Sequence, residues 1–580
     1  MELTKRKIGD KEVFPFTIPS GIITTDTSSL ENIANEVLEI GVLTTKSIGL
    51  RPRLMPTEDL LEKKKAGLLE DVDLLAYREP ILAQFAPYHF VNAVGLANPG
   101  AEEFSRRLGQ IQIPEDKFLL VSIFGKDEGE FVDVANILKE HADGFELNLS
   151  CPHAKGVGMQ LGQNPELVRK IVAAVKTVTG KPIFAKLTPN VSNIAEIARA
   201  AIEAGAYGIT AINTVGPIEY KFNSHCVLTN KKGGESGRGI TATGIKCVKD
   251  ITDSLGNIPL IGCGGIYTAT DVIAYANAGA SFFGVGTALA GMSEQEIKSY
   301  FKTLVKDLKN GTNNAGDLIK KVNMEYQKFL VARKISPAKD FHILQMEGYF
   351  KSKPGQFVFA WLPEKGEKPF SVMDDDPLTI GFSERGCFTR ELARLKEGDQ
   401  IYFRGPYGNT DLAELVEGNT NYFSGTGGGL TPINNSPKVV LVGGGCGIAG
   451  IYMFAKASHG NHPHIFLGAK DKDHIPLLDE LKRYGIVYIA TEDGSLGSKG
   501  LVSELLQKGL NELREGMLFI NCGPRAMIDA VVDIERRYTV PEMIYSSIDY
   551  MTKCGVGVCG SCADKKGLRT CVEGPFMDNS

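Results

Sequence analysis

Cys151 is a residue whose chemical type and position suit catalysis. The segment before it, residues 145–150, alternates apolar and polar side chains, a pattern typical of a β-strand. Pro152 is expected to end that strand, because proline cannot donate to a ladder. A thiol on a loop at the carboxyl end of a strand can act as a general base or nucleophile if its pKa is tuned. The alternative is a small buried apolar side chain, the usual role of a cysteine outside disulfides.

Four cysteines near the end of the sequence form its most specific motif. They are Cys554, Cys559, Cys562 and Cys571. The spacing C-x4-C-x2-C with a further cysteine beyond it is that of a [2Fe–2S] site. Glycines 555, 557 and 560 leave the backbone amides free to turn toward cluster sulfurs. Four thiolates would also suit Zn²⁺, but the four-residue first gap favours iron.

Lysines, asparagines and glycines gather at the ends of apolar segments in the first half. Lys46 and Ser47 follow residues 42–45, Lys186 lies in residues 185–190, and Asn213 with Thr214 follows residues 211–212. Together they suit an anionic, hydrogen-bonding cofactor and substrate, whereas a single lysine would be merely solvated. Glycine-rich residues 262–265 and 284–286 follow two later segments, where backbone N–H groups often bind phosphate. Tight turns are the alternative for these glycines.

The elements that must position these residues predict an α/β protein that begins with a TIM (β/α)₈ barrel. Eight strand candidates are residues 16–22, 42–48, 119–124, 145–149, 183–187, 208–212, 259–261 and 282–285. Helices are predicted between them, for example over residues 164–177, 193–204 and 270–278. Eight βα units in about 300 residues are enough to close a barrel. Cys151 and the polar strand ends would then share its catalytic face.

The second half predicts a different architecture. A charged helix and a polar turn within residues 292–325 indicate a domain boundary. Short strands at 341–346, 356–361, 378–382 and 400–404 predict a small antiparallel barrel. Residues 411–437 read as a flexible polar insert. The strand 438–442 then runs into Gly443, Gly444, Gly445 and Gly447, which suits a dinucleotide diphosphate at a helix N-terminus, although the spacing is not a full Rossmann fingerprint.

Composition excludes several classes of function. The 580 residues are 43% hydrophobic and 23% charged, as in ordinary globular proteins, and predict several domains. A net charge of −5 is not the basic charge typical of a nucleic-acid-binding protein. The first residues lack an apolar signal core, and no run of about 18 apolar residues suggests a membrane span. Eleven cysteines, an odd number, argue against a full disulfide framework and favour a cytoplasmic location.

Residues 1–310 resemble dihydroorotate dehydrogenases of the soluble, FMN-containing kind. The matching segments are TKS at 45–47, NAVGLANPG at 92–100, NLSCP at 148–152, KL at 186–187, NT at 213–214, GGESG at 233–237, CGG at 263–265 and VGT at 285–287. The resemblance implies that (S)-dihydroorotate is oxidised to orotate in de novo pyrimidine (UMP) biosynthesis. It also implies that Cys151 takes the C5 proton while the C6 hydride goes to FMN.

The same resemblance implies which residues bind the two ligands. Substrate would be held by Lys46, Asn92, Val94, Gly95, Leu96, Asn148, Asn213 and Thr214, the 94–96 amides receiving its carboxylate. FMN would be held by Ser20, Gly21, Lys46, Ser47, Asn148, Lys186, Gly237, Gly264, Gly265, Gly286 and Thr287. One departure is His153, where the family has asparagine. This residue and residues 162–168 are closer to dihydropyrimidine dehydrogenase, so an NAD(P)H-linked uracil or thymine dehydrogenase is the alternative.

Residues 325–580 resemble the electron-transfer subunit of NAD-dependent dihydroorotate dehydrogenases. Lys368, Pro369, Phe370, Ser371, Gly386 and Thr389 match the FAD barrel of ferredoxin-reductase-like proteins, although the family has arginine at the position of Lys368. The resemblance implies electron passage from FMN through the [2Fe–2S] cluster and FAD to NAD⁺, and a homodimer formed through the first barrel. The expected domains are 1–310 for FMN, 325–412 for FAD, 436–540 for NAD and 541–580 for the cluster.

Overall fold

The computed structural model describes residues 3–69, 71–149, 159–416, 423–424, 431–432, 437–511, 516–547 and 551–579. The chain divides into two compact units. The first comprises Met1–Glu325 and Val556–Arg569, and the second comprises Tyr326–Gly555 and Thr570–Ser580. The four domains expected from the sequence stay a prediction, and the expected cluster domain, 541–580, has residues in both units.

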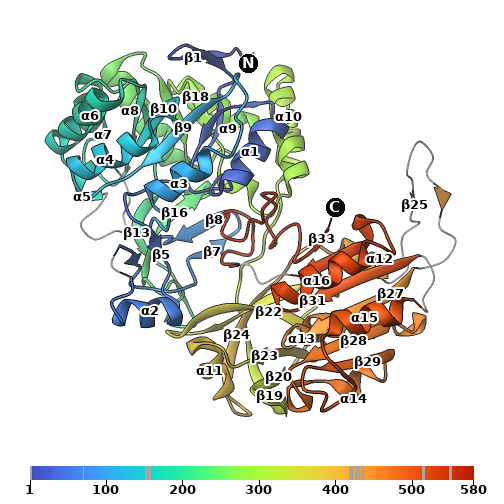
Figure 1. Ribbon diagram of the computed structural model, residues 1–580. Coiled ribbons are helices and arrows are strands. Elements are labelled where there is room, and N and C mark those ends of the chain that lie inside the picture. The colour runs from blue at the N-terminus through green and yellow to red at the C-terminus, as the bar shows by residue number, and fades with distance from the viewer. Residues whose placement is uncertain are drawn as a thin grey trace. The chain divides into compact units, whose positions relative to one another are not determined.

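The first unit contains a closed eight-stranded parallel barrel, as the sequence predicts (Figure 1). In barrel order the strands are β10 (Gly144–Asn148), β11 (Ile183–Leu187), β12 (Gly208–Ala211), β17 (Leu260–Cys263), β18 (Phe282–Gly284), β3 (Phe16–Ile18), β4 (Ile40–Thr44) and β9 (Phe118–Ile123). Each overlaps one of the eight segments expected from the apolar pattern, usually within two or three residues. Buried side chains throughout these strands explain why the pattern is nearly continuous in hydrophobicity.

Helices cover the outside of this barrel (Figure 1). They include α1 (Thr27–Glu36), α3 (Ala101–Leu108), α4 (Glu128–Leu138), α6 (Pro165–Thr179), α7 (Ile194–Glu203), α8 (Thr241–Leu255), α9 (Ala269–Asn277) and α10 (Glu294–Asn310). Asn164 and Asn193 begin α6 and α7, and their side chains accept from backbone N–H groups of the first turn. The apolar faces of these helices and the outer strand residues form one continuous core.

A second sheet in the first unit is antiparallel and is not among the elements expected from the sequence. Its order is β13 (Val215–Glu219), β16 (Lys232–Gly237), β8 (His89–Asn92) and β7 (Leu82–Ala86). Short pairs complete the unit: β1 (Arg6–Ile8) with β2 (Lys11–Val13), β5 (Arg53–Leu54) with β6 (Asp73–Leu74), and β14 (Lys221–Phe222) with β15 (His225–Cys226). The helices α2 (Glu58–Lys65) and α5 (Met159–Gly162) lie in its loops.

The second unit opens with a closed six-stranded antiparallel barrel. Its order is β19 (Gln327–Ala338), β20 (Phe341–Met346), β23 (Leu378–Ser383), β22 (Gly366–Asp375), β21 (Phe357–Leu362) and β24 (Gln400–Tyr407), with α11 (Cys387–Ala393) after β23. This confirms the antiparallel barrel, although β19 and β22 are missing from the four strands expected. Pro369 inside β22 argues against a strand, yet it lies opposite Phe359 of β21.

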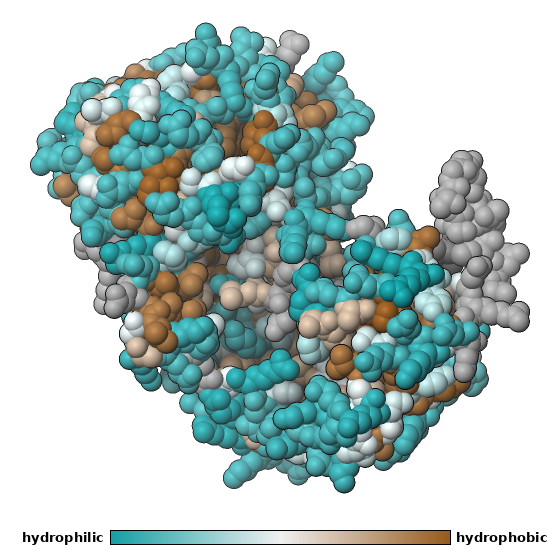
Figure 2. Space-filling model, viewed as in Figure 1, coloured by the Kyte–Doolittle hydropathy of each residue, from teal (hydrophilic) through white to brown (hydrophobic). Residues whose placement is uncertain are grey.

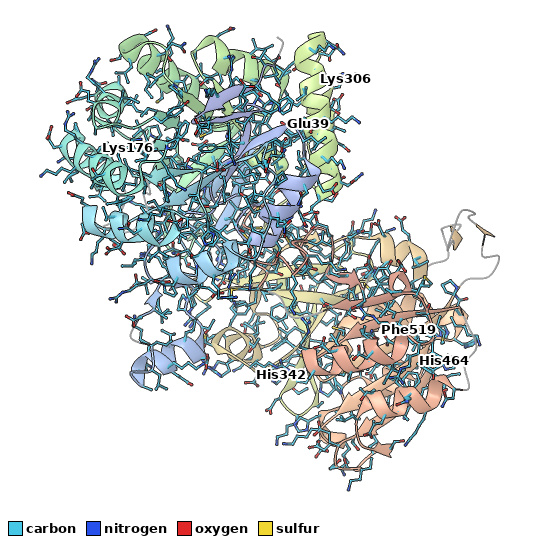
Figure 3. The ribbon with its side chains drawn as sticks, turned by 45° about the horizontal axis from the view of Figure 1, so that its top comes forward. Glu39, Lys176, Lys306, His342, His464 and Phe519 are labelled. Carbon is cyan, nitrogen blue, oxygen red and sulfur yellow. The ribbon has the colours of Figure 1, made fainter. Side chains whose placement is uncertain are left out.

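A seven-stranded, mostly parallel sheet completes the second unit. Its order is β30 (Ser498–Lys499), β29 (Ile486–Thr491), β28 (His464–Ala469), β27 (Lys438–Gly444), β31 (Met517–Cys522), β32 (Ile544–Ser547) and the antiparallel β33 (Phe576–Asp578). The helices are α13 (Gly447–Ala457), α14 (Leu478–Leu481), α15 (Val502–Leu510) and α16 (Arg525–Glu535). Figure 3 labels Phe519, fully buried on β31, and Lys306, exposed on α10 of the first unit.

The segment expected to be a polar insert, 411–437, differs at its start. Asp411–Val416 form the helix α12, which buries four of its six residues. Of the rest, only β25 (Phe423–Ser424), β26 (Thr431–Pro432) and residue 437 belong to the described residues.

In the view of Figure 2, hydrophilic residues cover most of the visible surface of each unit. Within the described residues, no helix is both long and apolar enough to cross a membrane.

Candidate active site

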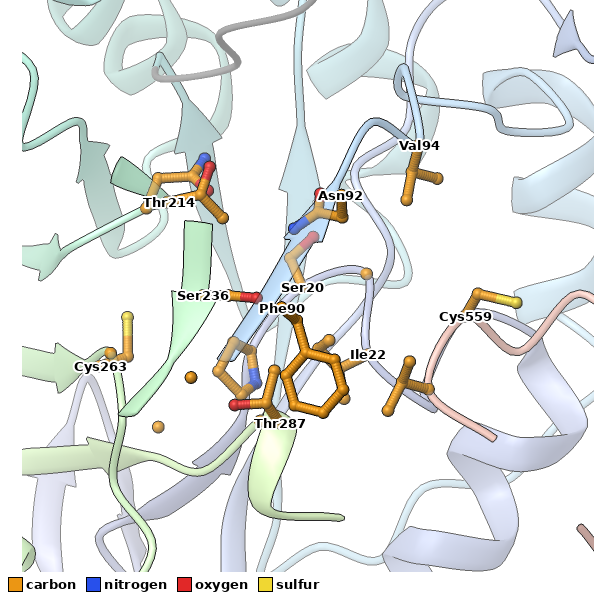
Figure 4. A pocket seen from close by; sticks show the side chains of 18 of the residues that line it. Ser20, Ile22, Phe90, Asn92, Val94, Thr214, Ser236, Cys263, Thr287 and Cys559 are labelled. Carbon is orange, nitrogen blue, oxygen red and sulfur yellow. The ribbon is translucent and has the colours of Figure 1, made fainter. Parts of the chain in front are cut away.

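A pocket in the first unit gathers every residue predicted to bind substrate or FMN (Figure 4). These lining residues are Ser20, Gly21, Lys46, Ser47, Asn92, Val94, Gly95, Leu96, Asn148, Lys186, Asn213, Thr214, Gly237, Gly264, Gly265, Gly286 and Thr287. Several of them end or follow barrel strands, so the pocket lies at the carboxyl end of the barrel. Cys151, Pro152 and His153 lie outside the described residues.

A chain of hydrogen bonds connects the polar residues at the pocket floor. Asn148 Nδ2 donates to Ser47 Oγ at 2.8 Å, and Ser47 Oγ lies 2.9 Å from both Ser20 Oγ and Ser122 Oγ. Ser122 Oγ donates to a carboxylate oxygen of Glu146 at 3.0 Å. Because a carboxylate only accepts, Ser47 must donate to Ser122 and Ser20 must donate to Ser47. The amide of Asn148 is therefore held in one orientation.

Glu146 is a functional candidate that the sequence reasoning overlooked. Its carboxylate lies 3.4 Å from Lys186 Nζ, and both side chains are at most 5% exposed. The pairing follows from register, because Glu146 and Asn148 both face inward from β10, and Lys186 lies beside them on β11. A buried charge needs such a partner, since an isolated ion loses its hydration on burial. The alternation that identified the strand places Glu146 on the same face as Asn148, and the closed barrel turns that face inward.

Val94, Gly95 and Leu96, in the loop after β8, line the pocket. Gly95 and Leu96 have φ values of 72° and 60°, the left-handed region. A Cβ at Gly95 would overlap the hydroxyl of Tyr77, so only glycine fits there. Asn98 holds the loop: its Nδ2 donates to Leu96 O at 2.9 Å, and its Oδ1 accepts from the Gly49 and Gly100 N–H groups. Successive amides in such a turn form a concavity suited to an anion.

Glycines 264, 265 and 286 also line the pocket, together with Thr287. The hydroxyl of Tyr267 donates to Thr287 Oγ1 at 3.0 Å, and the Arg238 guanidinium stacks 4.4 Å from the centre of the Tyr267 ring. Arg238 also forms an ion pair with Asp271 at 2.7 Å. Burial raises the pKa of Tyr267 to about 12, so its hydroxyl keeps its proton and can hold Thr287 in place.

Cys263 lines the same pocket (Figure 4). It differs from a catalytic thiol in the ease with which it loses its proton. Its Sγ donates to the Ile212 carbonyl at 3.1 Å. Burial raises the pKa of Cys263 to about 11. The side chain is therefore a neutral thiol near neutral pH.

Comparison with known proteins decides the family. A model of the dihydroorotate dehydrogenase family matches residues 77–308. The catalytic subunit of dihydroorotate dehydrogenase B (NAD(+)) from Pyrococcus abyssi is 42% identical over 279 residues, which are 47% of this chain and 83% of that protein. The chain belongs to the dihydroorotate dehydrogenase family. The Pyrococcus horikoshii protein of the same name is 38% identical and covers 53% of this chain and 92% of its own length.

The second unit matches a different family model, the oxidoreductase NAD-binding domain, at residues 441–533. The chain is thus an oxidoreductase that joins a dihydroorotate dehydrogenase domain to an NAD-binding domain, as the sequence predicts. A solved structure of an NADH-dependent reduced ferredoxin–NADP oxidoreductase is 30% identical and covers 43% of this chain and 88% of that chain. Its TM-score of 0.37 is too low to bear on fold or function.

The residues predicted to bind FAD lie on the antiparallel barrel. Lys368, Pro369, Phe370 and Ser371 belong to β22. Gly386 precedes α11, and Thr389 Oγ1 accepts from the Arg385 and Gly386 N–H groups at 2.9 and 3.0 Å. The rings of Phe370 and Phe388 stack with centroids 6.3 Å apart, which brings the two groups together.

The predicted NAD residues lie where β27 turns into α13. Gly443 and Gly444 end the strand, and Gly447 begins the helix. A Cβ at Gly447 would overlap the Cys522 carbonyl at the end of β31. Only glycine therefore lets the first turn of α13 approach the sheet this closely. The N-terminus of a helix that follows such a strand is suited to a diphosphate.

The four cysteines of the C-terminal motif are buried, at 0, 6, 1 and 1% exposure for Cys554, Cys559, Cys562 and Cys571. Val558 and Cys559 also line the pocket of the first unit. Among the described residues, no group of three or more metal-ligating side chains is arranged around a common point. The role of these cysteines as cluster ligands stays a prediction.

Proposed function

We propose that the chain oxidises (S)-dihydroorotate to orotate with NAD⁺ as the final electron acceptor, a step of de novo pyrimidine biosynthesis. The observation that carries the proposal is the convergence of Lys46, Asn92, Asn148, Asn213 and residues 94–96 on one pocket of a family member. Amides and lysines suit a planar ring that carries amide groups and a carboxylate. FMN would share the pocket, with Ser47, Lys186 and the glycines at 264, 265 and 286 around it.

Three further ligands complete the proposal. FAD would bind along β22 and α11, NAD at the start of α13, and a [2Fe–2S] cluster at Cys554, Cys559, Cys562 and Cys571. Buried thiols as the donor set, with glycines between them, suit such a cluster. When bound, FMN would accept the hydride, the cluster would carry electrons one at a time to FAD, and FAD would collect two electrons for hydride transfer to NAD⁺.

The residues of the chain have separate tasks in this reaction. Cys151 would take the C5 proton, while Asn148, fixed through Ser47, would orient the ring. The Lys186 ammonium, paired with Glu146, would favour negative charge at the flavin without leaving an uncompensated buried ion. The amides at 94–96 would receive the substrate carboxylate. A homodimer and a cytoplasmic location stay predictions.

A substrate panel tests this function against the dihydropyrimidine alternative. Anaerobic mixing with dihydroorotate should bleach the bound flavin, and NAD⁺ should then yield NADH. Dihydrouracil lacks the carboxylate that the 94–96 amides would bind, so its kcat/KM should be lower. Equal kcat/KM for the two substrates would contradict the assignment and favour a dihydropyrimidine dehydrogenase.

A further inference from the structure

The second unit contains a buried carboxyl group that the proposed reaction does not use. Glu535 is the last residue of α16 and is fully buried. Its Oε2 accepts a hydrogen bond of 2.8 Å from the Nδ2 of Asn521, which lies on β31 and is also fully buried. Glu535 forms no ion pair with any described residue. An ionised carboxylate with a single donor is costly to bury, so the protonation state of this group needs an explanation.

Two atoms of this pair lack a hydrogen-bond partner among the described residues. They are Glu535 Oε1 and Asn521 Oδ1, and both are shielded from solvent. If Glu535 were ionised, both atoms would be acceptors, and neither would have a donor. A protonated Glu535 carries one O–H donor, which is the group that Asn521 Oδ1 lacks. A carboxylic acid and a primary amide can therefore satisfy each other with two hydrogen bonds, one in each direction.

Burial, rather than a neighbouring charge, controls the ionisation of Glu535. The elements packed against α16 include α15, β31 and β32. The two strands carry no charged residue, and their titratable groups are Cys522 and Tyr545. The charged residues on α15, on the rest of α16 and directly after it are all exposed; they are Glu504, Lys508, Arg525, Asp529, Asp533, Arg536 and Arg537. Burial raises the pKa of Glu535 to about 8, and the hydrogen bond from Asn521 offsets part of this rise. The group is therefore mostly neutral at pH 7.

Asn521 directly precedes the residue that packs against the predicted NAD site. In the sheet Asn521 lies opposite Val442 of β27, and Cys522 lies opposite Gly443. A Cβ at Gly447 would overlap the Cys522 carbonyl, so the end of β31 is in close contact with the first turn of α13. A change in the position of the end of β31 would therefore change the shape of the loop that leads into α13.

We propose that Glu535 is a positioning residue for NAD: as a neutral carboxylic acid it exchanges two hydrogen bonds with the Asn521 amide and so fixes the end of β31 against the start of α13. The inference rests on the proposed function, because it takes the start of α13 as the NAD site. Loss of the proton leaves two buried acceptors without a donor, which disfavours this arrangement. The ionised form should therefore bind NAD⁺ less tightly than the neutral form.

Glu535→Gln provides the sharpest test, because glutamine keeps a donor and an acceptor but cannot ionise. The Kd of the oxidised holoenzyme for NAD⁺ is measured by isothermal titration calorimetry from pH 7 to pH 9, without turnover. With a pKa of about 8, roughly a tenth of wild-type protein is neutral at pH 9, so its Kd should rise about tenfold if only the neutral form binds. In Glu535→Gln the Kd should stay at the wild-type value of pH 7.

Asp533→Asn is the matched control, because it removes an exposed carboxylate from the same helix and should follow the wild-type pH profile. A Kd that rises equally in wild type and in Glu535→Gln would show that another group titrates and that the positioning role is wrong. A constant wild-type Kd from pH 7 to pH 9 would also overturn the role.

Infrared spectroscopy separates failure of this role from failure of the proposed function. Wild type at pH 7 should show the absorption of a protonated carboxylic acid that Glu535→Gln lacks, whether or not NAD⁺ binds. If that absorption is missing, the neutral acid and its pairing with Asn521 are wrong. If it is present but wild-type protein binds no NAD⁺ at any of these pH values, the proposed NAD site is wrong instead.

Discussion

The pocket of the first unit and the cysteine motif obtain their geometry in different ways. The pocket is assembled by regular structure: parallel strands end at the same edge, and side chains such as Asn148 and Lys186 meet because their strands are in register. The motif lies in a segment without helices or strands, and donors distant in sequence hold its backbone. Local geometry can thus be fixed by repetition of one element or by many individual contacts, and the second kind should be more sensitive to single substitutions.

The largest effect is expected from removing a motif thiol. Cys554→Ser should abolish NAD⁺-coupled oxidation, because a proposed thiolate ligand of the cluster is lost. Flavin reduction by dihydroorotate should persist, since the pocket residues are untouched. Stopped-flow flavin bleaching and steady-state NADH formation measure the two activities separately. Unchanged coupled turnover in protein shown to lack the cluster would refute the electron path.

The second largest effect is expected from removing Cys151, the proposed general base. Cys151→Ala should slow flavin reduction by dihydroorotate by a factor of about 10²–10⁴, the usual contribution of a positioned general base. NADH-dependent diaphorase activity should stay at the wild-type level. In Cys151→Ser, activity should rise with pH more steeply than in wild type, because a hydroxyl ionises at higher pH. Near wild-type single-turnover rates in Cys151→Ala would show that the thiol only packs.

Breaking the buried ion pair tests how strongly the pocket depends on one contact. Glu146→Gln leaves the Lys186 charge without its partner, which typically costs about 3–5 kcal/mol. Ser122→Ala is the matched control, because it keeps the ion pair and removes two hydrogen bonds of one hydroxyl, 3.0 Å to the same carboxylate and 2.9 Å from Ser47. It should cost about 1–2 kcal/mol. Urea unfolding of both variants measures the difference. Equal losses would mean that the pair is not what holds the pocket floor.

The smallest effect is expected in the alkylation of cysteines, which should differ between Cys263 and the four cysteines of the C-terminal motif. Burial raises the pKa of Cys263 to about 11, so its reactive thiolate is scarce at pH 8. Alkylation by iodoacetamide, followed by mass spectrometry, should leave Cys263 unlabelled at pH 8. Labelling should increase only as the pH approaches 11. Chelation of iron should expose the four motif cysteines to the reagent but leave Cys263 unchanged, and early labelling of Cys263 would contradict its neutral state.

Sequence reasoning performed best where structure is periodic. Apolar runs predicted the eight barrel strands, and Asn164 and Asn193 marked the starts of two helices. Glu146 was overlooked because a charged residue in an alternating strand suggests a solvent face, and only the closed barrel turns that face inward. The strand β22 was missed because Pro369 opposes a strand assignment.

The anchoring of the motif was beyond the reach of sequence reasoning. Its spacing indicated a cluster, but the contact between Thr25 and Cys559 joins residues 534 positions apart. No local pattern connects such residues, because the contact depends on how the complete chain folds. The burial of Arg404 could not be predicted from the sequence either, because arginine side chains are normally exposed.

The assignment of Val556–Arg569 to the first unit has a consequence for dissecting the protein. The chain passes between the two units at three points, after residues 325, 555 and 569. A single cut at the apparent boundary therefore cannot release an intact first half: a fragment of residues 1–325 would lack the segment that bonds to Ile23, Thr25 and Ser29. Residues 556–569 belong to the first unit although they follow most of the second unit in sequence. We therefore expect fragments 1–325 and 326–580 to fold better when they are co-expressed than when either is expressed alone.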